Sequence, residues 1–106
     1  MEKVKLIKVA TDFHDELIGR FITDSDYHGE KFREEYLVPA LKDYDKVIVD
    51  FDGVEGYGSS FLEEAFGGLI HTRKLSREDV LSKLTLVSKE DESLVEEILG
   101  YIEKAN

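Results

Sequence analysis

The sequence contains no cysteine, no tryptophan and a single proline. Without cysteine the chain can form neither a disulfide framework nor a thiolate nucleophile. No apolar run approaches the roughly 18 residues that a membrane-spanning helix needs, and the first residues lack the apolar core of a signal peptide. We therefore expect one domain over residues 1–106, located in the cytoplasm, that folds without a disulfide or a structural metal.

Positive charge is also scarce, because 24 acidic residues outnumber 14 lysines and arginines and leave a formal net charge of −10. This charge disfavours sequence-independent binding to nucleic acid or to anionic membranes, which are themselves negative. Lys3, Lys5 and Lys8 alternate along the chain, which is typical of the solvated face of a strand. A basic or amphipathic protein is a more natural partner than DNA.

The residues present are organised around the stretch 47–70. Val47–Val49 is a short β-branched run that predicts a buried strand, and Asp50 and Asp52 follow at its carboxyl end. A glycine-rich turn comes next. The sequence from Ser60 to Glu63 then matches a capping box, and apolar residues recur at helical spacing up to Ile70.

The remaining segments alternate between strand and helix patterns. In the first strand, residues 3–9, Val4, Leu6 and Val9 are expected to face the core. We expect Pro39 to kink the helix that covers residues 29–42 or to divide it into two pieces. The other expected elements are a hairpin strand at 18–23, a short helix capped by Ser76, a strand at 84–87 and an amphipathic helix at 91–104. This order predicts an α/β fold, a small mixed sheet of three to four strands flanked by helices.

Three segments carry a resemblance to a known family. GEKFREEYLVPAL, VIVDFDGVEGYGSSFLEEAFGGLI and SREDVLSKLTLVS resemble the bacterial STAS-like family of uncharacterised domains. More distantly, the chain is similar to the STAS domains of anti-sigma-factor antagonists, in which a partner kinase phosphorylates a serine at a helix start. That position corresponds to Ser59, with Ser60 beside it. Gly58 and Phe61 stand where the antagonists have an acid and a glycine.

The resemblance implies a STAS-like regulatory domain, not an enzyme, that binds a protein and needs no cofactor. A kinase-like, ATP-binding regulator is the implied partner, and a phosphate on Ser59 would release it by adding about −1.5 to −2 charge. The alternative role of the serines is helix capping. The oligomeric state stays open. The expected partner-binding residues surround the helix start: Glu55, Tyr57, Gly58, Ser59, Phe61 and Leu62.

Two alternative functions arise from the same stretch. The sequence of residues 50–54, DFDGV, matches the first motif of haloacid-dehalogenase-like phosphatases, in which Asp50 would be the nucleophile and Asp52 the general acid beside Mg²⁺. The turn from Gly53 to Ser60 could instead bind a phosphate or a nucleotide through its backbone amides.

Several other polar residues are weaker candidates. His14, His28 and His71 lack metal-ligand spacing and are expected at the surface. Arg20 and Arg33 are expected to be solvated or ion-paired. The acidic run 90–92 precedes a helix, so we expect it to cap that helix.

Overall fold

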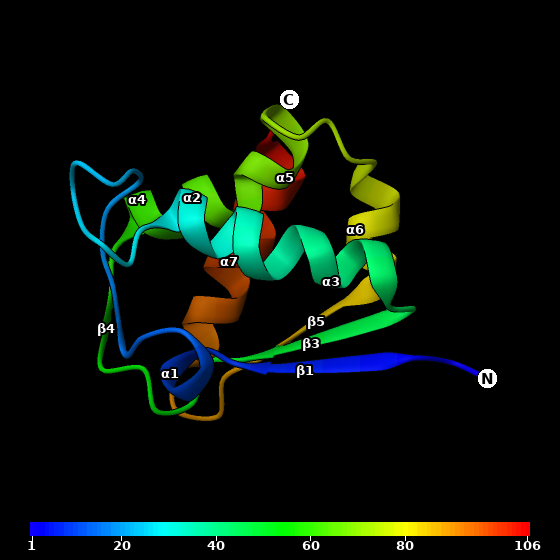
Figure 1. Cartoon of the computed structure of the whole chain (residues 1–106), viewed down its shortest axis with the longest axis horizontal. Coiled ribbons are helices and arrows are strands. Elements are labelled where there is room, and N and C mark those ends of the chain that lie inside the picture. The colour runs from blue at the N-terminus through cyan, green and yellow to red at the C-terminus, as the bar shows by residue number, and fades with distance from the viewer.

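Two small parallel sheets organise the fold, and the computed structural model describes residues 1–106. In the larger sheet, β3 (Lys46–Asp50) lies between β1 (Val4–Lys8) and β5 (Leu84–Val87) (Figure 1). The smaller sheet pairs β2 (Glu16–Leu17) with β4 (Gly56–Tyr57). The expected α/β fold and its small sheet are therefore confirmed.

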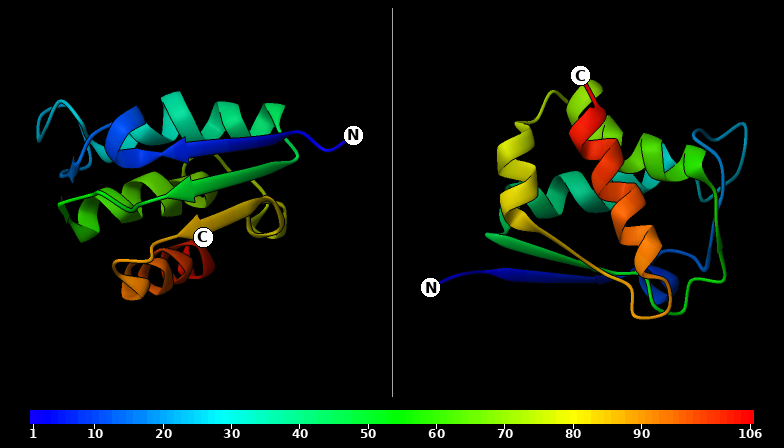
Figure 2. Two further views of the ribbon diagram at one scale, coloured as in Figure 1. Left: turned by 90° about the horizontal axis from the view of Figure 1, so that it is seen from below. Right: turned by 180° about the vertical axis from the view of Figure 1, so that it is seen from behind.

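Apart from the short helix that directly follows β1, the helices gather on one face of the larger sheet (Figures 1 and 2). Two of them are continuous but contain a widened π-helical turn. The first comprises α2 (Gly29–Phe32), η1 (Arg33–Leu37) and α3 (Val38–Asp43), and the second comprises α4 (Ser59–Leu62), η2 (Glu63–Gly67) and α5 (Gly68–His71). The others are α1 (Val9–Asp12), α6 (Arg77–Lys83) and α7 (Glu92–Lys104).

The helix-covered face of the sheet holds the core, and the opposite face is open. Val47 and Val49 of β3 and Ile7 of β1 are buried under the helices. Val4 and Leu6 point to the other face and are 50% and 47% exposed. The prediction that these two residues face the core is therefore wrong, because alternation along a strand does not reveal which face the helices cover.

The helix that contains Pro39 continues through residue 43 instead of breaking. Its irregularity is η1, in which the Val38 N–H bonds to the carbonyl of Arg33, five residues earlier. Pro39 then occupies the first turn of α3, where a missing N–H is tolerated. The predicted disturbance is present, but as a wide turn just before the proline.

No strand forms at residues 18–23, so the predicted hairpin is wrong. β2 ends at Leu17 and pairs in parallel with β4. Gly19 then turns the chain with a φ of +84°, and the Asp24 carboxylate accepts hydrogen bonds from the Arg20 and Phe21 N–H groups. Because the Asp24 side chain accepts hydrogen bonds from these backbone N–H groups, the segment forms a local turn and does not pair as a strand.

The second half of the chain follows the prediction closely. The strands β3 and β5 lie where expected, and Ser76 caps α6 by accepting from the Asp79 N–H. Asp91 caps α7 by accepting from the Ser93 N–H, as predicted for the acidic run before that helix. The apolar stripe of α7 buries Leu94, Ile98 and Ile102.

The two π-containing helices approach each other closely where glycines leave space. A Cβ atom added to Gly29 would lie 2.6 Å from the carbonyl oxygen of Phe61 and 3.3 Å from the amide nitrogen of Ala65. At Gly68, an added Cβ would collide with the guanidinium of Arg33. Small residues at both crossings therefore fix how near the helices can lie.

We expect Gly29→Ala to lower the free energy of unfolding by about 1–3 kcal/mol, because the new methyl group overpacks against backbone atoms that cannot rotate away. Gly100→Ala in α7 is the matched control, since an added Cβ meets nothing within 4 Å there. The control should gain about 0.5–1 kcal/mol from better helix propensity. Guanidinium denaturation followed by circular dichroism measures both changes, and equal effects would contradict the proposed close packing.

Candidate functional site

The helix that carries the candidate serines begins at Ser59, one residue earlier than predicted. Gly58 occupies the N-cap position, and no side chain caps the helix. The Glu63 side chain does not return to the helix start but bonds to Arg20 and His71. The predicted capping box is therefore wrong. Ser59 and Ser60 are both exposed in the first helical turn.

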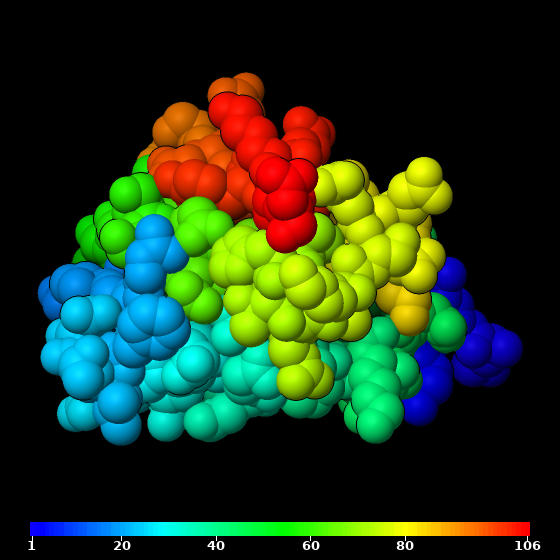
Figure 3. Space-filling view, turned by 90° about the horizontal axis from the view of Figure 1, so that it is seen from above, coloured from blue at the N-terminus to red at the C-terminus, as the bar shows by residue number.

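A hollow in front of this helix start is shared with the segment that follows β2. It is lined by Ile18, Gly19, Arg20, Asp24, Gly58, Ser59 and Ser60. The same segment exposes Ile18 (52%), Phe21 (42%) and Ile22 (71%). Figure 3 shows this segment (blue) at one end of the molecule, beside the green start of α4. Ile18 lines the hollow together with the exposed serines, whereas Ile22 lines a second hollow beside the helix that begins at Gly29.

A buried ion pair joins the two π-containing helices behind this hollow. Arg33 is only 2% exposed, and its Nη1 donates to Glu64 Oε2 at 2.6 Å and to the Glu64 carbonyl at 2.7 Å. Its Nε donates to Glu34 at 2.8 Å. Burial alone would lower the pKa of Arg33, but the hydrogen bonds to Glu34 and Glu64 outweigh burial and raise it.

A second, partly exposed cluster fastens the 18–28 segment to the same helix. Arg20 Nη1 lies 2.5 Å from Glu63 Oε1 and 3.5 Å from Glu64 Oε1, and His71 Nε2 lies 2.9 Å from Glu63 Oε2. Burial would raise the pKa of Glu63, yet the hydrogen bonds with Arg20 and His71 prevail and hold it below its usual value. Arg20 is thus a structural anchor as well as a lining residue of the hollow.

The carboxylates of Asp50 and Asp52, at the end of β3, accept hydrogen bonds from backbone N–H groups. Asp50 accepts a hydrogen bond from the Asp52 N–H at 2.9 Å. Asp52 accepts from the N–H groups of Lys89 and Glu90 at 2.8 and 3.1 Å, which ties the β3 end to the segment after β5. No group of three or more His, Cys, Asp or Glu side chains is placed to hold a metal ion. These contacts give Asp50 and Asp52 a structural role that needs no phosphatase chemistry.

The amides of Gly53, Glu55 and Gly58 in the glycine-rich turn are engaged within the molecule. Gly53, with a φ of +93°, donates to the carboxylate of Glu90 at 2.5 Å. Glu55 donates to the Asp15 carbonyl at 2.7 Å, and Gly58 donates to the Leu17 carbonyl at 2.8 Å. A phosphate bound in this turn would have to displace these acceptors. These three amides therefore give the anion-binding hypothesis no support.

The expected partner-binding residues divide between surface and core. Phe61 and Leu62 are 0% exposed and belong to the core, so a partner cannot reach them in this structure. The helix turns their side chains towards the sheet, whereas Ser59 and Ser60 face outward. Glu55 is exposed, as expected for a contact residue.

Tyr57 and His28 have internal hydrogen-bond partners. The Tyr57 hydroxyl donates to Asp91 Oδ2 at 2.7 Å and so links β4 to the cap of α7; this bond raises the pKa of Tyr57. His28 is only 6% exposed and its Nδ1 lies 2.9 Å from the Ser25 carbonyl, so its predicted surface position is wrong. His14 and His71 are half-buried.

Sequence reasoning missed the apolar part of this site. Ile18, Phe21 and Ile22 looked like strand residues because they are β-branched or aromatic. The signal against a strand was local: Gly19 and Asp24 supply the positive φ and the side-chain acceptor that a turn uses. Reading those two residues together would have placed the apolar side chains on a loop.

Comparison with known proteins identifies one family. The model of a family described as a STAS-like domain of unknown function (DUF4325) matches residues 28–94, more than half of the 106 residues. The match includes both π-containing helices, β3, β5 and the start of α7. Searches of curated proteins and of solved structures found no match. None of the helices is both long and apolar enough to span a membrane.

We expect Glu64→Gln to lower the free energy of unfolding by about 3–5 kcal/mol, because it leaves the buried charge of Arg33 without its main counter-ion. Glu96→Gln, an exposed substitution of the same kind in α7, should change stability by less than about 0.5 kcal/mol. Chemical denaturation of both variants provides the measurement. A small effect at Glu64 would mean that Glu34 alone compensates Arg33.

The lowered pKa of Glu63 predicts an acid-sensitive contribution to stability. Because its pKa is lower in the folded than in the unfolded chain, the contribution is present above the unfolded value of about 4.3 and is lost as the pH falls through the folded value. Urea denaturation between pH 7 and pH 3 should therefore show a shallower acid decline for Glu63→Gln than for the wild type. Parallel curves for the two proteins would refute this assignment.

Proposed function

Because this chain belongs to the STAS-like family DUF4325, we propose that it is a regulatory domain that acts by binding another protein and not by catalysis. The family assignment supports a STAS-like architecture. The choice of binding over catalysis is supported by the acids and amides of the 50–58 stretch, which are engaged in internal hydrogen bonds. The proposal therefore concerns the surface around the start of α4.

The observation that carries this proposal is the exposure of three large apolar side chains in the segment after β2, which shares a hollow with that helix start. We define the docking surface as Ile18, Phe21, Ile22, Ser59 and Ser60. Single exposed hydrophobic residues are ordinary, but three large apolar side chains exposed between residues 18 and 22 favour an interaction site. The Arg20–Glu63 ion pair holds the apolar segment against α4, so the two halves of the surface are presented together.

The chemistry of this surface describes its partner. An apolar cleft is needed to receive Phe21 and Ile22, and basic groups at its rim would complement a chain of net charge −10. A kinase-like, ATP-binding regulator of the kind implied by the STAS antagonists is the partner we propose. Asp24, which is exposed and lines the same hollow as the two serines, supplies an acidic group for such a rim.

We further propose that phosphorylation of Ser59 controls the interaction. The hydroxyl is exposed in the first turn of a helix, where a phosphate is tolerated by the helix dipole. Arg20, which lines the same hollow, is already paired with Glu63 and Glu64. The added charge would therefore remain largely uncompensated and would weaken the fit to an apolar cleft, which favours release.

The test is affinity capture with four forms of the protein: wild type, Ile22→Asp, Ser59→Asp and Ser82→Asp. Ile22 is 71% exposed, so its substitution should leave folding intact. Ser82 is exposed on α6 and supplies a matched control for an added carboxylate. We expect a partner retained by the wild type and by Ser82→Asp to be lost with Ile22→Asp and weakened at least about tenfold with Ser59→Asp.

The two outcomes separate the parts of the proposal. Retention by Ile22→Asp equal to that of the wild type would contradict the docking surface itself. Loss with Ile22→Asp but full retention by Ser59→Asp would keep the surface and reject the switch. Intact-mass measurement of the wild type and of Ser59→Ala, each incubated with the captured partner and ATP, then shows whether a phosphate is added and whether its addition requires Ser59.

A further inference from the structure

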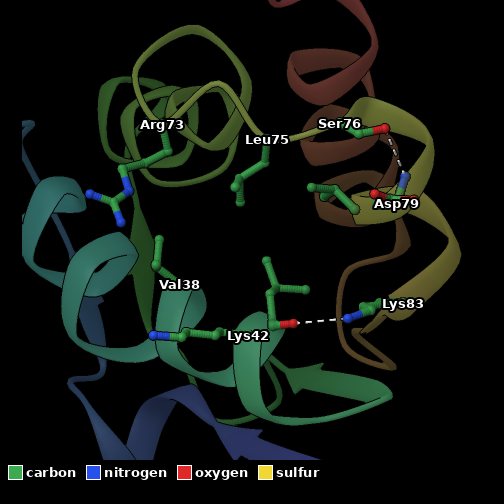
Figure 4. A pocket seen from close by; sticks show the side chains of 9 residues that line it. Val38, Lys42, Arg73, Leu75, Ser76, Asp79 and Lys83 are labelled. Atoms are coloured by element: carbon green, nitrogen blue, oxygen red, sulfur yellow. Dashed lines mark hydrogen bonds between the residues drawn. The ribbon is translucent and has the colours of Figure 1, made fainter.

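A pocket of about 320 Å³ lies away from the docking surface, between α3, the connection from α5 to α6, and α6 itself (Figure 4). These elements stand at the opposite end of the helical layer from the 18–28 segment (Figure 1). None of the pocket residues takes part in the candidate site described above. A volume of this size is at the lower end of the range for small-molecule sites.

The inner wall of the pocket is apolar and comes from all three segments. Val38 and Leu41 of α3, Leu75 of the connection and Val80 of α6 line it. Figure 4 shows Val38 and Leu75 directed from opposite sides into the same space. Leu41 and Val80 are 7% and 2% exposed, so the wall is continuous with the core. A compact apolar group placed here would remove this wall from water.

The polar rim has the opposite charge to the rest of the molecule. Lys42, Arg73 and Lys83 surround the pocket together with a single acid, Asp79. A rim with three cations and one carboxylate is unusual in a chain whose formal net charge is −10. The local excess of positive charge therefore favours an anion at this mouth.

The three cations differ in how far they are already engaged. Lys83 Nζ donates to the carbonyl of Leu41 at 3.0 Å, and Arg73 lies 3.4 Å from a carboxylate oxygen of Glu34. The side chain of Lys42 is exposed, and its Nζ makes no hydrogen bond or ion pair within the protein. Lys42 thus has its full hydrogen-bonding capacity available, and Arg73 retains donors beyond its contact with Glu34.

We infer that this pocket binds a small organic anion, a carboxylate attached to a compact apolar body. The apolar wall receives the body, and Lys42 and Arg73 receive the carboxylate at the mouth. A neutral apolar molecule would not pair with Lys42 and Arg73, and inorganic phosphate would not bury the apolar wall of the pocket. An amphipathic anion satisfies both surfaces.

The probe for this site is 3-phenylpropionate, and 3-phenylpropionamide is its neutral counterpart of the same shape. Titration of isotopically labelled wild-type protein, followed by two-dimensional NMR, should move the signals of Val38, Leu41, Leu75 and Val80. We expect the carboxylate to bind at least about fivefold more tightly than the amide, as several partly exposed charge contacts allow. Equal affinities would overturn the inference, as would shifts confined to other residues.

Two variants test the charge and the wall separately. Lys42→Gln should weaken the carboxylate about two- to fivefold and leave the amide unchanged. Lys31→Gln removes a lysine of α2 that pairs with Glu35 and does not line the pocket, and as a control it should change neither ligand. Val38→Phe fills the pocket and should abolish binding of both probes. Loss of carboxylate binding equally in Lys31→Gln and Lys42→Gln would assign the effect to overall charge and reject the site.

Discussion

The buried pair of Arg33 and Glu64 is the constraint on which the arrangement of the helices depends. An arginine that is 2% exposed must keep its counter-ion, because an uncompensated buried charge is far more costly than a missing apolar contact. The guanidinium also needs room, which the absent side chain of Gly68 provides. Both π-helical turns include a member of this pair, so charge compensation, close packing and helical irregularity occur at one place.

The π-helical turn that contains Glu64 also holds a surface segment in place through the neighbouring residue. Glu63, next to Glu64, turns outward and takes Arg20 and His71 as partners. Through Arg20, the 18–28 segment, which has no regular structure of its own before α2, is fixed against the start of α4. Its exposed apolar residues thus lie on a loop that the hydrogen bonds of Arg20 and Asp24 hold in place. An interaction surface of this kind loses little conformational entropy when a partner binds.

Local patterns predicted the elements but not their relations. The run Val47–Val49, the caps Ser76 and Asp91 and the stripe of α7 each determine structure through neighbours in sequence, and each was confirmed. Local patterns could not predict which face of β1 is buried. Ile7 is buried and Leu6 is exposed because the helices that cover the sheet come from segments far along the chain. Likewise, a capping box at Ser60 was locally consistent, yet Glu63 found stronger partners 43 and 8 residues away. The position of the Glu63 side chain therefore depends on ion pairs with residues distant in sequence, which residue spacing alone does not reveal.

The central position of β3 has a consequence for the order in which the sheet can assemble. β1 and β5 each pair only with β3, through partners such as Val4 with Lys46 and Val47 with Leu84. Neither edge strand has a neighbour before residues 46–50 are available, and both pairings close long loops. The amino-terminal strand must therefore remain unpaired during synthesis until β3 emerges. The lysines that alternate with Val4 and Leu6 place positive charge along this unpaired strand, which disfavours its pairing with strands of other chains.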